Sequence, residues 1–228
     1  MNTALLSEVT PGFARPVHGA QSVFRQVLEA MSRPGRVLSL DTDDALDGLR
    51  APAAPGAAMG RGMAALLLTL LDAETTLQLG GTLSTPQATA FCRFHTGVSL
   101  VGQAARAAFS AWRHDEAMPA LWRQLDNGSD ESPEGGATLL IEVASLVAVD
   151  PLAAGVDAPE RALRLRGPGI EAMHRLVVGG LARDFWLERI AMQLLYPRGV
   201  DLVLCCGERV AAIPRSTVIE QEAACTSR

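Results

Sequence analysis

Apolar side chains recur every three or four residues in several parts of the chain, a spacing that predicts helices with one buried face. The clearest such segment covers residues 17–31, and Pro34-Gly35 ends it. On its buried face we expect Ala20, Val23, Phe24, Val27, Leu28 and Met31. Further helices are predicted over residues 59–71, 86–94, 119–125 and 184–195. We expect Asp184 to cap the last of these helices and Leu194 to be buried in it.

Strands are predicted where apolar residues alternate or run together between turn-forming residues. They cover residues 36–40, 75–79, 107–113, 138–146, 162–166, 200–206, 209–213 and 216–220. Gly207-Glu208 separates two of these strands, and glycine first in a two-residue loop favours a type II′ hairpin turn. Because strands and helices alternate irregularly, we predict one α/β domain over residues 1–228, with a mixed sheet, flanking helices and a frayed tail from Gln221.

The chain has 228 residues and no lysine, so its twenty basic side chains are all arginine, against twenty-five Asp plus Glu. Without lysine, no side chain can form the Schiff base that pyridoxal phosphate requires, and a Walker-type phosphate loop is also excluded. Codon bias in a GC-rich genome explains the absence of lysine. Selection of the guanidinium group for anion binding is the alternative explanation.

The rest of the composition argues against several classes of protein. A net charge of −5 without a basic stripe argues against a nucleic-acid-binding protein. The longest strongly apolar run, residues 63–71, is too short to span a bilayer, and the first seventeen residues lack a signal-peptide pattern. The four cysteines show no disulfide framework, so we expect a reduced, cytoplasmic protein without a membrane, a nucleic acid or a cofactor as partner.

Two glycine-rich segments resemble phosphate-binding loops in part. Gly167-Pro168-Gly169 follows a predicted strand and precedes helix-compatible sequence, the context of a dinucleotide-binding fingerprint. In the strand before it, leucine alternates with arginine, whereas a central parallel strand is usually apolar on both faces. In addition, Pro168 removes a backbone N–H, and no acidic residue lies at the end of a following strand. A plain turn is therefore the better interpretation. Gly60-Arg61-Gly62 follows a loop instead of a strand, and we set it aside.

The end of one predicted helix carries candidates for an anion site or a partner site. Cys92 and His95 are spaced like two zinc ligands, but structural zinc needs four, and no second pair lies nearby. Arg93, His95 and Thr96 supply hydrogen-bond donors that suit an oxyanion or a partner's carboxylate. The alternative is structural, with Cys92 in the core and His95 closing the helix.

The C-terminal hairpin supplies the remaining candidates, Glu208, Arg209 and Arg215. Because a hairpin brings its ends together, we expect Arg209 and Arg215 to lie near each other, in a contact between subunits or in an active site. Simple solvation of charges at a turn is the alternative. Glu142 lies inside an apolar run, so its carboxylate needs a partner such as an arginine unless it faces solvent.

Eight blocks of sequence, in order along nearly the whole chain, carry a resemblance to a known family. Two of them are Arg93-Phe94-His95-Thr96 and Leu163-Arg164-Leu165-Arg166-Gly167-Pro168-Gly169-Ile170. The full set covers residues 20–25, 30–35, 67–72, 93–96, 133–139, 163–170, 199–204 and 206–217. Together they resemble the PhnH family, a component of the bacterial carbon–phosphorus lyase system for phosphonate utilisation, over about residues 18–220.

The resemblance implies a fold like the large domain of pyridoxal-phosphate-dependent transferases, without the cofactor site. It also implies a homodimer in isolation and a complex with sister subunits of the G, I, J and K types. In that pathway a phosphonate is joined to C1′ of the ribose of ATP with loss of adenine, and a radical step on the J-type subunit later breaks the carbon–phosphorus bond. The family offers no established catalytic residue in its PhnH members, so none is assigned.

Two hypotheses about function follow. The first is an accessory subunit, without its own active site, of the transferase complex that forms α-D-ribose 1-methylphosphonate 5-triphosphate. The alternative is a small-molecule binder or enzyme with an arginine-lined pocket for a phosphonate or nucleotide. That pocket would bring together some of Arg93, His95, Arg209 and Arg215. A solitary pyridoxal enzyme conflicts with the missing lysine.

Overall fold

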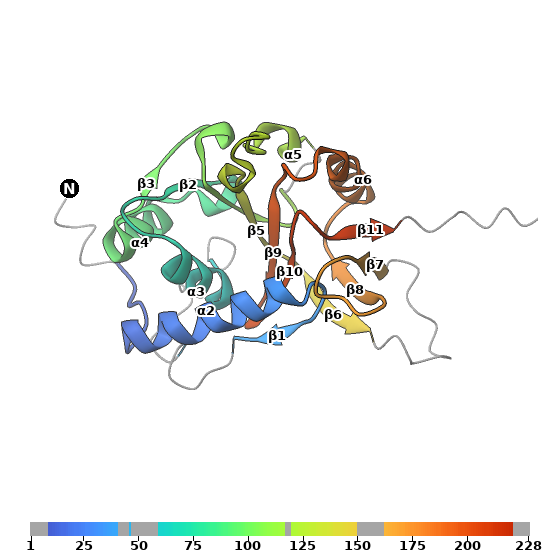
Figure 1. Ribbon diagram of the computed structural model, residues 1–228. Helices are drawn as coiled ribbons and strands as arrows, with labels where there is room; N and C mark the ends of the chain where they lie inside the picture. Colours follow the sequence, from blue (N-terminus) through green and yellow to red (C-terminus); the bar gives the residue numbers. More distant parts are fainter. Residues whose placement is uncertain (1–8, 41–45, 47–58, 117–119, 150–161, 221–228) are drawn as a thin grey trace, which may run out of the picture.

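The computed structural model describes residues 9–40, 46, 59–116, 120–149 and 162–220 (Figure 1). These residues form a seven-stranded mixed sheet with helices on both faces, and a four-stranded antiparallel sheet packs on one of those faces. The expected α/β class, with a mixed sheet and flanking helices, is confirmed. The tail from Gln221, predicted to be frayed, lies outside the described residues.

Five neighbouring strands of the large sheet are parallel. In spatial order the large sheet consists of β1 (Leu38–Ser39), β10 (Arg209–Ile213), β9 (Asp201–Cys206), β5 (Thr138–Glu142), β4 (Phe109–Arg113), β2 (Thr76–Leu79) and β3 (Ser99–Leu100). At one edge β10 pairs antiparallel with β9, the last of the five parallel strands, and β1 pairs antiparallel with β10. The small sheet consists of β11 (Val218–Glu220), β7 (Ala162–Arg166), β8 (His174–Gly179) and β6 (Ser145–Val149). Each predicted strand matches at least one of these.

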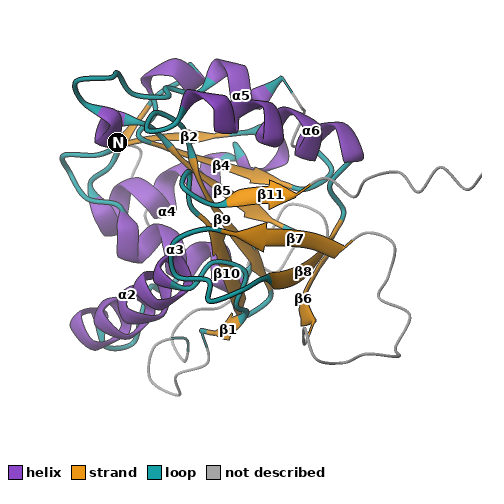
Figure 2. Cartoon of the chain, turned by 45° about the vertical axis from the view of Figure 1, so that its right-hand side comes forward, coloured by secondary structure: helices purple, strands orange, loops and turns teal. Residues whose placement is uncertain are grey.

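The helices divide between the two faces of the large sheet (Figure 2). α2 (Pro16–Ser32), α3 (Arg61–Leu70) and α4 (Pro86–Thr96) cover one face. The other face is covered by α5 (Leu121–Gln124), α6 (Arg183–Met192) and the small sheet. Short 3-10 turns are η1 (Gly81–Leu83), η2 (Ala104–Arg106), η3 (Pro133–Gly135) and η4 (Gln193–Leu195). Among the described helices, none combines the length and apolar character needed to cross a membrane.

The central strands send alternate side chains into two separate cores, as the period of two in a strand requires. On β5, Leu139 and Ile141 face the core with α5 and α6, whereas Leu140 faces the core with α2, α3 and α4. On β9, Leu204 faces the core with α5 and α6, and Val203 faces the core with α2, α3 and α4. These strands are therefore buried on both faces, as is usual for parallel sheets.

The apolar run over residues 138–146 forms two strands in different sheets, so the prediction of one strand is wrong. The N–H of Val143 donates to the carbonyl of Cys205 at 2.8 Å, which keeps the chain beside β9. The next residue, Ala144, donates to the carbonyl of Gly179 on β8 at 3.1 Å. Because β5 and the start of β6 are both rich in apolar residues, hydrophobicity gives no sign of the change from one sheet to the other.

Gly167-Pro168-Gly169 joins two antiparallel strands, β7 and β8, which agrees with its interpretation as a plain turn. The helix-compatible sequence after it forms β8, a strand that the sequence did not predict. A strand–turn–strand unit supplies no helix N-terminus for a pyrophosphate. Gly169 has a φ of 80°, and a Cβ there would lie 1.9 Å from the carbonyl oxygen of Ser32 at the end of α2.

The last predicted helix differs from expectation at both ends. α6 begins after Ala182, no side chain caps it, and Asp184 lies in its first turn instead. There the carboxylate interacts favourably with the helix dipole. The α-helix ends at Met192 and continues as the 3-10 turn η4, whose period of three changes the direction of the side chains. Leu194 is consequently 90% exposed and not buried as expected.

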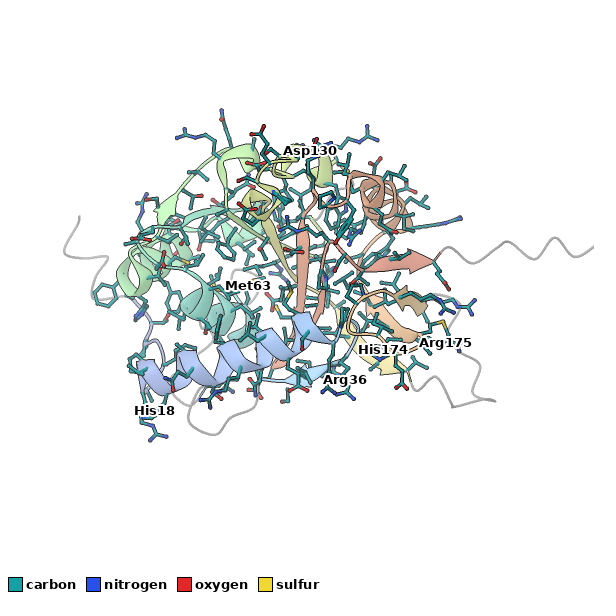
Figure 3. The ribbon with its side chains drawn as sticks, in the orientation of Figure 1. His18, Arg36, Met63, Asp130, His174 and Arg175 are labelled. Atoms are coloured by element: carbon teal, nitrogen blue, oxygen red, sulfur yellow. The ribbon has the colours of Figure 1, made fainter. Side chains whose placement is uncertain are left out.

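The predicted helix over residues 17–31 is confirmed as α2, but its buried face is narrower than expected. Val23, Val27 and Ala30 are buried against α3 and β10. Phe24 and Leu28, expected in the core, are 45% and 50% exposed. Figure 3 shows His18 on the outer side of α2, while Met63 of α3 lies in the interior.

The two-core arrangement makes a prediction about stability. Leu139→Ala and Leu140→Ala empty opposite cores, and each should lower the free energy of unfolding by about 2–5 kcal/mol, as measured by chemical denaturation. The control, Leu194→Ala at an exposed site, should change it by less than about 0.5 kcal/mol. A loss below about 1 kcal/mol for either buried leucine would contradict the two-core description.

Candidate functional site

A pocket of about 550 Å³ lies at the turn between β9 and β10. It is lined by Ser39, Arg61, Cys206, Gly207, Glu208 and Arg209. Gly207 has a φ of 60° and Glu208 does not have a positive φ, which fits the predicted type II′ turn. The N–H of Leu40, next to β1, donates to the carbonyl of Glu208 at 2.6 Å and holds the turn against the sheet edge.

The start of α3 closes one side of the pocket. A Cβ at Gly62 would lie 2.2 Å from the carbonyl oxygen of Gly207, so glycine is required for α3 to approach the turn this closely. The N–H of Gly60 donates to the Glu142 carboxylate at 3.3 Å. Among the described residues, the partner of Glu142 is therefore a backbone N–H and not the arginine that the sequence suggested.

The charges around the pocket are partly paired. The guanidinium of Arg61 donates to the Glu208 carboxylate at 2.8 Å and to the carbonyl of Leu46 at 2.6 Å. Arg209 is exposed, and among the described residues no ion pair to it is found. Within the described part of the chain, Arg209 is thus a cation at the pocket without a counter-charge. The sequence pointed to Glu208 and Arg209 but not to Gly60-Arg61-Gly62, because a helix following a loop lacks the context of a known phosphate loop.

Two adjacent cysteines lie on opposite faces of β9. Cys205 is fully buried, and its pKa is raised, chiefly by desolvation and then by the charge of Glu142. Cys206 lines the pocket, and its thiol lies 3.6 Å from the carbonyl of Ala144. Cys92, on α4, is buried, and desolvation raises its pKa to about 12. Cys92 therefore packs in the core, and among the described residues no group of three or more possible metal ligands is found.

The candidates on α4 take mainly structural positions. Nε2 of His95 lies 3.0 Å from the carbonyl oxygen of Thr10, and the ring makes edge contacts with Phe91 and Phe94. The hydroxyl of Thr96 donates to the carbonyl of Cys92 at 2.7 Å, within its own helix. Of the three candidates only Arg93 is exposed, and within the described part of the chain its guanidinium makes no hydrogen bond or ion pair.

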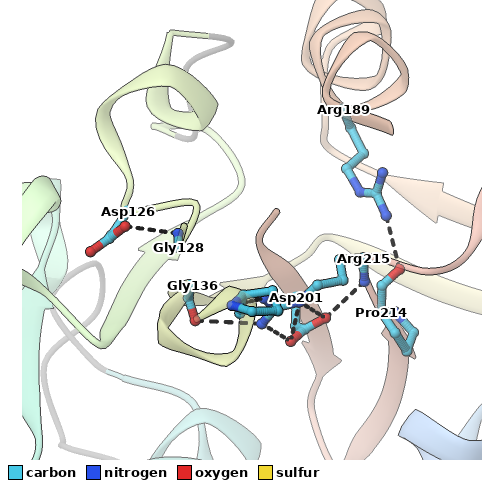
Figure 4. Close-up of polar contacts among 8 residues, drawn as sticks. Asp126, Gly128, Gly136, Arg189, Asp201, Pro214 and Arg215 are labelled. Atoms are coloured by element: carbon cyan, nitrogen blue, oxygen red, sulfur yellow. Dashed lines mark hydrogen bonds and ion pairs between the residues drawn. The ribbon is translucent and has the colours of Figure 1, made fainter. Parts of the chain in front are cut away.

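Arg215 does not lie near Arg209, so that expectation is wrong. Arg209 lies opposite Cys206 in the β9–β10 ladder, next to the turn. Arg215 follows the opposite end of β10, about 20 Å away along the strand. The backbone and the side chain of Arg215 both bond the carboxylate of Asp201, the first residue of β9 (Figure 4). The hairpin brings Arg215 to Asp201, a residue to which no motif in the sequence pointed.

A second buried arginine lies beside this pair. Arg189 of α6 is 2% exposed and donates to the carbonyls of Pro214 and Thr217 at 2.9 and 3.3 Å. Its guanidinium also lies 5.9 Å from the centre of the Trp122 ring. Desolvation lowers its pKa to about 10, while the charge of Asp201 acts in the opposite direction. Nothing in the sequence distinguishes this arginine from the exposed ones on helices.

Comparison with known proteins adds to this geometry. The family model described as bacterial phosphonate metabolism protein (PhnH) matches residues 11–220. The chain belongs to the PhnH family. The PhnH subunit of the α-D-ribose 1-methylphosphonate 5-triphosphate synthase of Rhizobium meliloti is 34% identical over 210 residues, which are 92% of this chain and 94% of the relative. HtxG of Stutzerimonas stutzeri, named as a putative C-P lyase subunit protein, is 31% identical over 204 residues, 90% and 87% of the two chains.

The match to PhnH confirms the resemblance and includes every described strand and helix. The six candidates nevertheless lie in three places in this PhnH chain. Arg93, His95 and Thr96 lie at the end of α4, and Glu208 and Arg209 lie at the hairpin turn. Arg215 lies with Asp201 at the other end of the hairpin. They do not form one site.

The Asp201–Arg215 pair makes a prediction about stability. Both side chains are 16% exposed, so Asp201→Asn or Arg215→Gln should each lower the free energy of unfolding by about 2 kcal/mol, because a mostly buried charge loses its counter-charge although its bonds to backbone groups remain. The double variant should lose less than the sum of the two. The control, Arg123→Gln in the exposed Arg123–Glu188 pair, should cost less than about 1 kcal/mol. Equal costs at both sites in denaturant titrations would contradict this role.

Proposed function

We propose that this chain is an accessory subunit of the bacterial complex that forms α-D-ribose 1-methylphosphonate 5-triphosphate from ATP and a phosphonate. The observation that carries this proposal is the 34% identity, over 92% of the chain, to a relative named as a subunit of that synthase. The name of the second relative, a putative C-P lyase subunit protein, agrees with it. Joining a phosphonate to the ribose C1′ with loss of adenine is a group transfer, so the complex is a transferase.

In this proposal the chain works through its partners and has no active site of its own. We place it in the cytoplasm, as a homodimer when alone and with sister subunits of the G, I, J and K types in the complex. The dispersed candidates support an accessory role, because catalysis needs its acid, base and nucleophile within hydrogen-bond reach of one another. Exposed apolar side chains such as Phe24, Leu28 and Phe94 are suited to partner contacts.

Two finer features of the fold belong to the same proposal. We infer one domain, because β5 and β9 contribute side chains to both cores and a division between the cores would split each strand. We also infer a likeness to the large domain of pyridoxal-phosphate-dependent transferases. The seven-stranded mixed sheet with helices on both faces supports this likeness. Without a lysine, no side chain of this fold can hold the cofactor as an internal aldimine.

Co-purification tests the proposed function. When the affinity-tagged chain is co-expressed with the four sister subunits of its own bacterium, all should elute together in gel filtration with a fixed stoichiometry. An unrelated protein with the same tag is the control, and it should capture none of them. Recovery of the chain as a free dimer, without sister subunits at low and moderate salt, would argue decisively against an accessory subunit.

One observation favours a second candidate function, an anion-binding pocket. Two arginines, Arg61 and Arg209, line the pocket at the hairpin turn, and Arg209 has a guanidinium that no described carboxylate pairs. Guanidinium groups bind phosphates and phosphonates through paired N–H donors. Arg93, His95 and Arg215, which the sequence suggested for such a pocket, do not line it.

Thermal unfolding tests this second function with methylphosphonate, inorganic phosphate and ATP as probes. A ligand at about one hundred times its Kd should raise the Tm by several degrees, because it binds the native state alone. Arg209→Gln should remove the shift, and Arg106→Gln, which changes an exposed arginine on η2, should keep it. If none of the three probes changes the Tm, the pocket binds no such anion, and the accessory-subunit proposal is unaffected.

A further inference from the structure

The outer side of α2 carries apolar side chains that the fold does not cover. Val17, Phe24 and Leu28 are 70%, 45% and 50% exposed, and we call these three residues the α2 stripe. Their spacing of seven and then four residues places them on one side of the helix. The opposite side of α2 already packs against α3 and β10. The apolar face of this helix is therefore wider than the contact that its own fold provides.

The end of α4 carries a further exposed apolar side chain, Phe94. His95 binds the carbonyl of Thr10, and a Cβ at Gly12 would lie 3.1 Å from the His95 ring. Phe13 in turn packs closely on Gly19 of α2. This short segment therefore contacts both the last turn of α4 and the first turns of α2. Phe94, which is 56% exposed on that turn, lies next to an exposed arginine, Arg93.

The charge around the stripe is opposite to the charge of the chain. Residues 16–33, which form α2 and its C-cap, contain two arginines, Arg25 and Arg33, and one glutamate, whereas the whole chain has a net charge of −5. Arg25 is exposed on α2, and His18 lies on its outer side (Figure 3). The glutamate, Glu29, is turned toward Arg36 at 3.7 Å. An exposed apolar stripe with a basic rim results.

We propose that the α2 stripe and Phe94 bind a sister subunit of the complex, in an apolar groove whose rim carries carboxylates. An exposed helix with anchors at positions i, i+7 and i+11 suits recognition of a helix by a groove. The basic rim favours a partner of opposite charge, which speeds association and selects against other partners. This proposal rests on the proposed function, because it assumes that sister subunits bind the chain.

A second copy of the chain fits this surface less well. In a two-fold symmetric dimer the same patch meets itself, so one basic rim would be placed against another. Like charges placed opposite each other in this way oppose association. An anionic membrane also fits less well, because the larger apolar side of α2 is turned into the protein and three apolar side chains remain outside.

The proposal is tested by measuring how an assembly of the sister subunits, prepared without this chain, binds purified variants of the chain. Phe24→Asp should weaken binding by about thirtyfold or more, because a central apolar anchor is replaced by a charge. Arg25→Glu should weaken it less and should reduce the dependence of the binding on salt. Leu194→Asp, at an exposed leucine on η4, is the matched control and should bind like the wild type. Circular dichroism and Tm establish that all three variants fold.

Four other results would contradict the proposal, and each would identify a different reason for its failure. If Phe24→Asp binds as well as the wild type, or if Leu194→Asp alone fails, the α2 stripe is not the docking surface. If Phe24→Asp converts a dimer to a monomer in light scattering, a second copy covers the stripe. Sedimentation of the wild type with phosphatidylglycerol vesicles, lost in Phe24→Asp, would assign the stripe to a membrane. If the wild type captures no sister subunit, the proposed function fails together with this inference.

Discussion

One carboxylate, that of Asp201, fixes one end of the large sheet. It accepts hydrogen bonds from the backbone and the side chain of Arg215, which joins the first residue of β9 to the segment after β10. The same guanidinium donates to the carbonyls of Pro133 and Gly136, so the turn before β5 is held at the same point. Because β5, β9 and β10 carry side chains into both cores, their alignment here sets the packing on both faces of the sheet.

The two ends of the β9–β10 hairpin are built differently. Beside Asp201, Arg189 stays protonated at neutral pH although burial lowers its pKa to about 10, and it holds the carbonyls of Pro214 and Thr217. Polar contacts there join α6, both strands and the turn before β5. At the other end, the close approach of Gly62 to Gly207 holds the turn and leaves a pocket beside it. A ligand of this hairpin therefore has room at the turn.

The parts of the fold that local rules determine were predictable from the sequence, and the parts that depend on neighbours were not. The Gly207-Glu208 turn follows from the need for a positive φ at its first position. The length of α2 follows from its periodicity and from Pro34. Its periodicity did not show that Phe24 is exposed, because the width of a buried face depends on what packs against it. Similarly, β8 was missed because it begins with the polar pair His174-Arg175 and follows helix-compatible sequence.

The candidate site shows the same division. Arg215 was recognisable as a charged residue at a hairpin, but its partner Asp201 depends on the register of β9 against β10. Arg189 gave no signal, because an arginine in a helix is usually solvated and its burial here depends on Trp122 and the segment after β10.

The absence of lysine has different consequences at different arginines. At Arg215 the planar guanidinium binds a carboxylate with two nitrogens and reaches two carbonyls as well. An ammonium group could not make this set of bonds, because its three donors radiate from one atom. At exposed Arg25 and Arg93 a lysine would supply the same charge to a partner's carboxylate. Codon bias therefore suffices to explain arginine at the surface, whereas the geometry around Asp201 requires it at Arg215 whatever the genome prefers.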